Sequence, residues 1–179
     1  MGLTTFGVVS TGAVSDTWDP TSTITGARGE PGTLHVYKND TTGEFSLVRI
    51  IQMDNNGCTA GQVLMLNHAT LKGYSRRVSA TTDSGAIPSG IAVTAIASQK
   101  CGYEYCGGYA IVDVSQDCAS GEYLMTSVST AGQLSNDRAS VFNAATSWGV
   151  TSSFFVCGVL RSVGTAACDA SIQMLGVWG

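Results

Sequence analysis

The chain has 179 residues, enough for one sizeable core together with an arm or a small subdomain. Charged residues make up only 12% of it, against roughly 25% in an ordinary soluble domain, and Gly, Ser, Thr and Ala take their place. The formal net charge of −4 argues against nucleic acid as a partner, whereas a surface with so few ions suits contact with other protein.

Residues 1–32 are rich in Thr, Ser and Gly and show little sustained periodicity. We interpret them as an extended N-terminal arm with one short strand at residues 6–9, and residues 33–179 as a single β-domain. The first fifteen residues lack the basic start and the long apolar core of a signal peptide. Nothing in the chain approaches the roughly 20 apolar residues of a membrane-spanning helix. We therefore expect no targeting segment and no membrane partner.

From residue 33 onward the pattern is typical of β-strands. The alternation in TLHVYK and FSLVRIIQM, on either side of NDTTGE, predicts a hairpin. The best helix candidate is SNDRASVFNAATSWG, which Asn136 or Asp137 could cap. Further strands are expected at 61–67, 74–82, 90–97, 109–114, 122–127, 152–163 and 170–178. Many short strands separated by turn residues predict an all-β fold, either a small β-barrel or a sandwich.

Two of these strands carry apolar residues on both faces. In YAIVDV, Ala110, Val112 and Val114 face one way, while Tyr109 and Ile111 face the other. Such strands suit burial by the core on one side and by a neighbouring subunit on the other. The candidate interface residues are Phe6, Val8, Tyr109, Ile111, Val177 and Trp178. For Trp178, an ordinary position in the core is the alternative.

The chain has six cysteines, none of them in a Cys-x-x-Cys pair, and their spacing from the histidines does not predict a zinc site. Cys101 and Cys106 bracket the turn-like piece CGYEYC and form a candidate disulfide. The alternative is that all six are thiols of a cytosolic product, with Cys157 a small buried apolar residue.

No arrangement of residues predicts catalysis. The chain has no Gly-x-Ser-x-Gly motif, and His35 and His68 lie in or beside predicted strands. The acids Glu104, Asp113, Asp117 and Glu122 are more typical of turns than of a glycosidase pair. DNNG has the composition of a tight turn and lacks the spacing of a calcium loop. We expect no catalytic residue, no cofactor and no metal.

A succession of short motifs spans residues 60–164: AGQVLMLN, IPSGIAVTAIA, GGYAIVDVS, ASGEYLMTS, TAGQL and VCGVLRSVG. This succession resembles the small β-barrel decoration (cement) proteins of tailed-bacteriophage heads, which share its order of turn glycines and strands. Where that family more usually has Gly-Asp before the leucine, this chain has Gly121-Glu122-Tyr123-Leu124. The six cysteines and the N-terminal stretch also lie outside the pattern.

The resemblance implies a structural virion protein, made in the host cytoplasm and located on the capsid surface. Its partners would be the major capsid protein, whose lattice it binds from outside, and further copies of itself in a homotrimer. Many modest contacts, repeated by symmetry, would stabilise the head.

Two other functions fit the pattern of strands. One is a β-domain of a head or tail fibre that attaches to the host, in which Tyr103, Tyr105 and Tyr109 would face a ligand instead of covering the core. The other is a secreted adhesive or carbohydrate-active β-protein, which would require disulfides.

Overall fold

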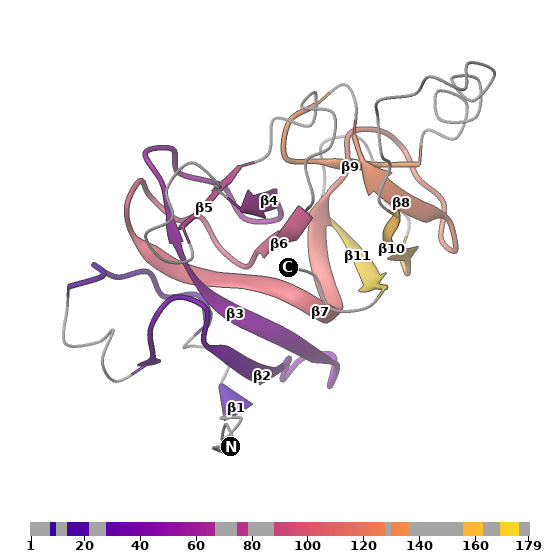
Figure 1. The fold of residues 1–179 in the computed structure, drawn as a ribbon. Coiled ribbons are helices and arrows are strands. Elements are labelled where there is room, and N and C mark those ends of the chain that lie inside the picture. The colour runs from indigo at the N-terminus through magenta and orange to yellow at the C-terminus, as the bar shows by residue number, and fades with distance from the viewer. Residues whose placement is uncertain are drawn as a thin grey trace.

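The computed structural model describes residues 8–9, 14–21, 28–66, 75–78, 88–127, 130–136, 156–162 and 169–175. Within them the chain forms eleven β-strands, which confirms the predicted all-β class (Figure 1). In chain order they are β1 Val8–Val9, β2 Leu34–Lys38, β3 Phe45–Met53, β4 Val63–Leu66, β5 Ser75–Val78, β6 Pro88–Ala92, β7 Cys101–Asp113, β8 Tyr123–Thr126, β9 Leu134–Ser135, β10 Val156–Leu160 and β11 Asp169–Met174.

The hairpin predicted around NDTTGE is present, with β2 antiparallel to β3. The side-chain oxygen of Asn39 accepts hydrogen bonds from the amides of Thr41 and Thr42, at 2.9 and 3.1 Å. Gly43 follows with φ +71°, a left-handed conformation that glycine adopts at little cost. Local turn chemistry thus fixes where β2 ends and β3 begins.

Strand β7 is longer than predicted. The segment CGYEYC, expected to be a turn, forms its first half, and the predicted strand 109–114 forms most of the second. Strand β6 ends at Ala92, earlier than predicted, and most of the candidate helix lies outside the described residues.

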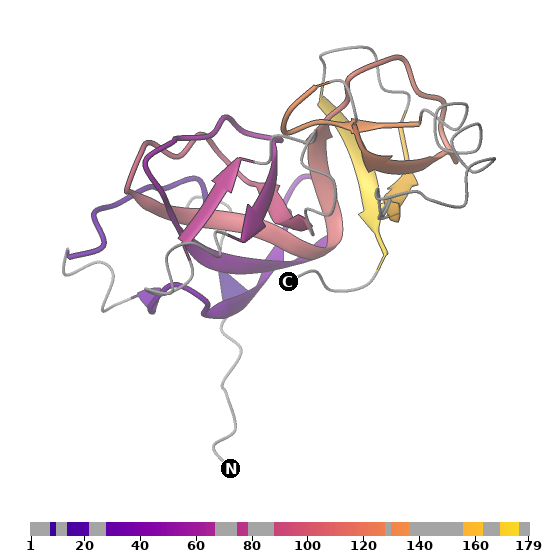
Figure 2. The ribbon, with the colours of Figure 1, turned by 45° about the horizontal axis from the view of Figure 1, so that its top comes forward.

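β7 belongs to two sheets, and it changes partners at Gly107 and Gly108. Residues up to Gly108 pair with β3, whereas Tyr109 to Asp113 pair with β11. The strand bends sharply between these parts (Figure 2). Gly108 has φ +80°, and a Cβ added there would lie 2.6 Å from the carbonyl oxygen of Phe45. A glycine is therefore required where the two sheets meet.

The strand order, β1-β2-β3-β5-β4-β6-β7-β11-β10-β8-β9, has two ends, so the eleven strands do not close into one barrel. The fold is a sandwich-like all-β fold, one of the two predicted forms. Within it, β3, β5, β4, β6 and β7 pair in that order, each strand with the next. The last of them, β7, also pairs with the first, β3.

The second half of the molecule repeats this arrangement. We call β3, β4, β5, β6 and residues 101–106 the first unit, and residues 109–114 with β8, β9, β10 and β11 the second unit. Corresponding strands make the same parallel or antiparallel pairings in both. The parallel pair between β3 and β5 has its counterpart in the parallel bridge from Val114 to Leu134.

The register of the two units matches residue by residue. Gly90 pairs with Leu64 and Gly158 with Leu124, and an irregularity in register follows each pair. A Cβ on Gly90 would lie 2.6 Å from the carbonyl oxygen of Tyr105, and one on Gly158 would lie 2.6 Å from that of Gln173. The same close contact between backbones therefore requires glycine at both places.

Each unit has an apolar interior. In the first it is formed by Ile51, Met53, Leu64, Ala92 and Ile96. The buried residues at matching positions of the second unit include Val112, Val114, Leu124 and Leu160.

Part of the predicted N-terminal arm packs against the first unit. Trp18 is only 5% exposed, and its backbone pairs with Cys101 through hydrogen bonds of 2.8 and 3.1 Å. Val14 is also buried, and β1 pairs with β2. These residues contribute to the domain, while the division of the chain at residue 32 stays a prediction.

A buried ion pair joins three strands of the first unit. The guanidinium of Arg49 donates to Glu104 Oε1 at 2.8 and 2.5 Å and to the Ser89 carbonyl at 2.8 Å. Glu104 is fully buried, and its other oxygen accepts from the Ser89 hydroxyl at 3.2 Å. The matching pair in the second unit is Ala110 with Ile172, so an apolar contact occupies that position there.

We predict that Gly108→Ala lowers the free energy of unfolding by at least about 2 kcal/mol, because it combines left-handed strain with a clash against backbone. Gly121→Ala is the control: Gly121 has φ +87° but no atom near its Cβ position, so only the strain of about 1 kcal/mol remains. Urea denaturation measures both, and equal losses would contradict the steric account.

The ion pair gives a second prediction. Glu104→Ile alone leaves the buried charge of Arg49 without its partner and should cost about 3–5 kcal/mol. The double substitution Arg49→Ala with Glu104→Ile installs the pair of the second unit and should cost less than that single change. A double-mutant cycle in urea measures the coupling, and additive losses would show that the two side chains act independently.

Candidate functional site

The second unit presents a partly exposed face that crosses four strands. Register places Tyr123 beside Val159, Val159 beside Gln173, and Gln173 beside Tyr109. Tyr123 is 50% exposed, Gln173 is exposed, and the other two are half-buried. Together with Ile111 and Ser171, which pair with each other, these residues form what we call the outer face: Tyr109, Ile111, Tyr123, Val159, Ser171 and Gln173.

Arg161 lies beside the outer face, next to Tyr109. Its guanidinium lies 5.7 Å from the ring centroid of Tyr109 and forms an ion pair of 2.7 Å with Glu44. The Arg161 carbonyl accepts a hydrogen bond of 3.1 Å from the Ser120 hydroxyl. Because the ion pair is partly exposed, it adds little stability. It leaves this side of the face without net charge and holds the ring of Tyr109 in place.

The structure shows where some of the candidate interface residues lie. Tyr109 and Ile111 lie on the outer face, and Ala110 and Val112 are buried beneath it, as the alternation predicted. The backbone of Val8 pairs with Val36. The remaining candidates, Phe6, Val177 and Trp178, lie outside the described residues, as does the side chain of Val8.

Sequence reasoning did not single out Tyr123, an exposed residue of the outer face. The signal was present as alternation in EYLMTS, where buried Leu124 follows exposed Tyr123. A second signal is the pattern Cys-x-x-Gly-x-x-Leu-Met, which occurs at 58–65 and again at 118–125. It marks matching turns and strands of the two units. In this pattern Tyr123 of the second unit occupies the position that buried Val63 has in the first.

The tyrosines of the fibre hypothesis lie in different environments. Tyr103 and Tyr105 are buried at 1% and 6% exposure, and burial raises the pKa of both. Tyr103 packs against Trp18 with ring centroids 5.4 Å apart, and Tyr105 packs against Tyr37 at 6.5 Å. These two tyrosines cover the core and do not face a ligand, whereas Tyr109 is half-exposed.

The predicted disulfide between Cys101 and Cys106 is not formed. Neither cysteine takes part in a disulfide, and the same holds for Cys58 and Cys118. The physical reason is that CGYEYC is strand and not turn. Five residues of strand span about 16 Å, whereas a disulfide needs Cα atoms within roughly 7 Å of each other.

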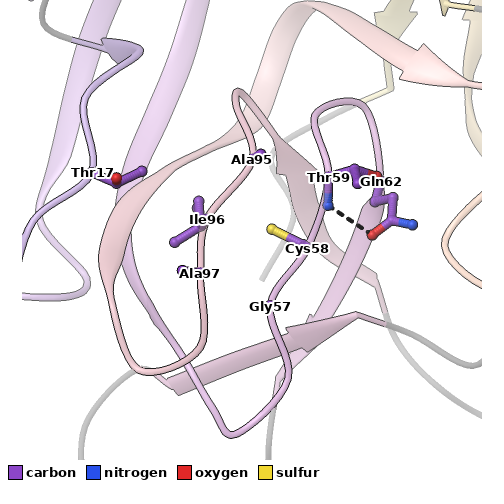
Figure 3. A pocket seen from close by; sticks show the side chains of 8 residues that line it. All are labelled: Thr17, Gly57, Cys58, Thr59, Gln62, Ala95, Ile96 and Ala97. Carbon is purple, nitrogen blue, oxygen red and sulfur yellow. Dashed lines mark hydrogen bonds between the residues drawn. The ribbon is translucent and has the colours of Figure 1, made fainter.

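A shallow depression lies beside the turn that precedes β4 (Figure 3). The amide of Thr59 donates to the side-chain oxygen of Gln62 at 3.1 Å. Burial raises the pKa of the Cys58 thiol from 9.0 to about 11, so the thiol stays protonated at neutral pH. The depression is lined by Thr17, Gly57, Cys58, Thr59, Gln62, Ala95, Ile96 and Ala97.

Two of the acidic residues noted in the sequence have structural partners. Glu104 is paired with Arg49, and Glu122 accepts from the amide of Ala119 at 2.8 Å. In DNNG, Asp54 accepts from the amide of Asn56 at 2.9 Å, as in the tight turn predicted. Within the described residues, no three His, Cys, Asp or Glu side chains gather where they could hold a metal ion. In the same part of the chain, no helix has the length and apolar character to cross a membrane.

The state of Cys58 is testable. At pH 8 a thiol of pKa about 11 has about 100-fold less thiolate than one of pKa 9.0, so Cys58 should react with iodoacetamide about that much more slowly than an unstructured cysteine peptide. The rate should rise with pH up to about 11. Peptide mass spectrometry resolves the individual cysteines. A Cys58 that reacts as fast as the control peptide would show that burial does not suppress its ionisation.

Of three comparisons with known proteins, one found a similarity, and it bears on the fold alone. No protein-family model matches the chain, and no curated protein does. Among solved structures, the chain is similar to the head fiber gp8.5 N base of bacteriophage phi29, with a TM-score of 0.50 and 12% sequence identity. The similarity covers 74% of this chain and 96% of that one.

Proposed function

We propose that the chain is a structural protein of a bacteriophage head that binds the outside of the major capsid protein lattice and stabilises it. The observation that carries this proposal is the fold: nearly all of the phi29 head-fibre base is matched by this chain. The motifs over residues 60–164, which resemble phage decoration proteins, point to the same class. Because the similarity in fold and the sequence motifs are independent observations and both indicate a phage head protein, this is the best-supported function.

The surface chemistry supports a binding role. Only 12% of the residues are charged, so little electrostatic repulsion or ion desolvation opposes contact with a neighbouring protein. The outer face is uncharged and carries Tyr109 and Tyr123, and the centres of protein interfaces are enriched in tyrosine and depleted of charge. Modest contacts repeated over a symmetric shell would hold each copy through avidity.

The proposal includes that the protein is not an enzyme and takes no cofactor. In support, the ionisable groups noted in the sequence have structural partners: Glu104 pairs with Arg49, and Glu122 closes a turn at Ala119. The thiols of Cys58 and Cys101 have pKa values raised by burial to about 11, which is the opposite of what activates a nucleophile.

The second candidate is the base of a head fibre that serves host attachment. The similarity to the phi29 protein favours it, since that protein is a head fibre base. The two functions differ in copy number and placement. A decoration protein occupies many equivalent lattice positions, whereas a fibre base occupies the positions from which fibres project.

The experiment is to add the purified chain to heads from a mutant phage that lacks it. We expect it to bind outside at many lattice positions, visible by cryo-electron microscopy, and to raise the temperature at which the heads release DNA. Heads already carrying the protein are the control and should gain nothing. Sparse binding at fibre positions would favour the second candidate, and no binding would contradict both.

A further inference from the structure

The matching faces of the two units are covered very differently. In the first unit, the six residues that correspond to the outer face are all nearly inaccessible to solvent. Their exposure is 0% to 6%, compared with 50% for Tyr123 and a half-buried or exposed state for the other members of the outer face. The six are Val48, Ile50, Val63, Ile91, Tyr103 and Tyr105.

One part of the cover over the first unit comes from the N-terminal side of the chain. Trp18 packs on Tyr103, and Arg28 lies 4.9 Å from the centroid of the Trp18 ring. His35 and Tyr37 of β2 pack against Tyr103 and Tyr105, with centroids 6.0 and 6.5 Å apart. An aromatic layer thus seals this face.

Another part of the cover is the second unit itself. The carbonyl of Gly61 accepts from the amide of Asp113 at 2.9 Å, and the amide of Val63 donates to the carbonyl of Gly132 at 2.8 Å. Through this edge the first unit binds another folded unit of the same design. The residues at the matching edge of the second unit are Gly121 and Tyr123, and both are exposed.

We propose that the outer face, with the edge at Gly121 and Tyr123, binds a second copy of this chain. The interface between the two units of one chain is the precedent. There, the equivalent edge of the first unit, at Gly61 and Val63, binds the second unit. A repeat unit that lacks a cap buries its open face against a neighbouring unit. Charge does not oppose the contact, since Arg161 beside the face is neutralised by Glu44.

The composition of the outer face agrees with an interface formed after folding. Where the first unit has Tyr103 and Tyr105, the second has Ser171 and Gln173. These polar residues lower the cost of exposing the face to water in the free chain, while Tyr109, Ile111 and Tyr123 supply the apolar contact. Unlike the sealed face of the first unit, this one tolerates water until a partner covers it.

The test is sedimentation of the full chain over a range of concentrations, in the absence of heads. We expect the wild-type chain to associate, and Tyr123→Lys and Ile111→Lys each to weaken association at least tenfold. Ser98→Lys, which places the same charge in an exposed turn, is the control and should associate like wild type. Thermal unfolding checks that the variants fold. Should Ile111→Lys unfold, Gln173→Lys takes its place, because Gln173 is exposed.

Two results would overturn the proposal: a wild-type chain that stays a single protomer at all concentrations, or face variants that associate as strongly as wild type. Head binding separates this proposal from the proposed function. A protomer that binds heads, and loses binding through Tyr123→Lys, would assign the outer face to the capsid protein and overturn only self-association. An oligomer that does not bind to heads would overturn only the proposed function.

Discussion

Both sheets of this protein depend on one strand. β7 pairs with β3 up to Gly108 and with β11 from Tyr109, so it supplies the last strand of the first unit and the first strand of the second. The change of direction occurs at Gly108, which has a left-handed backbone conformation. A side chain there would collide with the backbone of Phe45, so only glycine fits. Because the bend sets how the second unit leaves the first, it also sets where the outer face lies.

The two units show which features of the sequence the topology needs. Both keep the glycine of β6 or β10, the turn glycine at 61 or 121, and the Leu-Met pair that follows. They differ at the buried pair, which is ionic in Arg49 and Glu104 and apolar in Ala110 and Ile172. The same strand arrangement forms around both, so the ion pair is not what specifies it. Backbone contacts at the glycines and the alternation of apolar residues are shared, and these specify the arrangement.

Local pattern predicted much of the fold. The bounds of β3 follow from alternation and from the Asn and Gly of the preceding turn, and the inward and outward residues of β11 follow from a period of two. CGYEYC was predicted to be a turn, but it is the first half of β7. Its tyrosines are instead covered by Trp18, His35 and Tyr37, which are distant in sequence. The contact of Arg49 with Glu104, 55 residues apart, also has no local signal. Of the candidate site, Tyr109 and Ile111 were predicted, whereas Tyr123 required the comparison of the two units.

The central claim is that the outer face of the second unit is covered when the protein works. Hydroxyl-radical footprinting measures this directly, by comparing the oxidation of Tyr123 in the dilute free chain and in the assembled particle. The account predicts severalfold protection of Tyr123 on assembly, while Trp18, already 5% exposed, reacts slowly in both states. Equal oxidation of Tyr123 in the free and the assembled protein would contradict it.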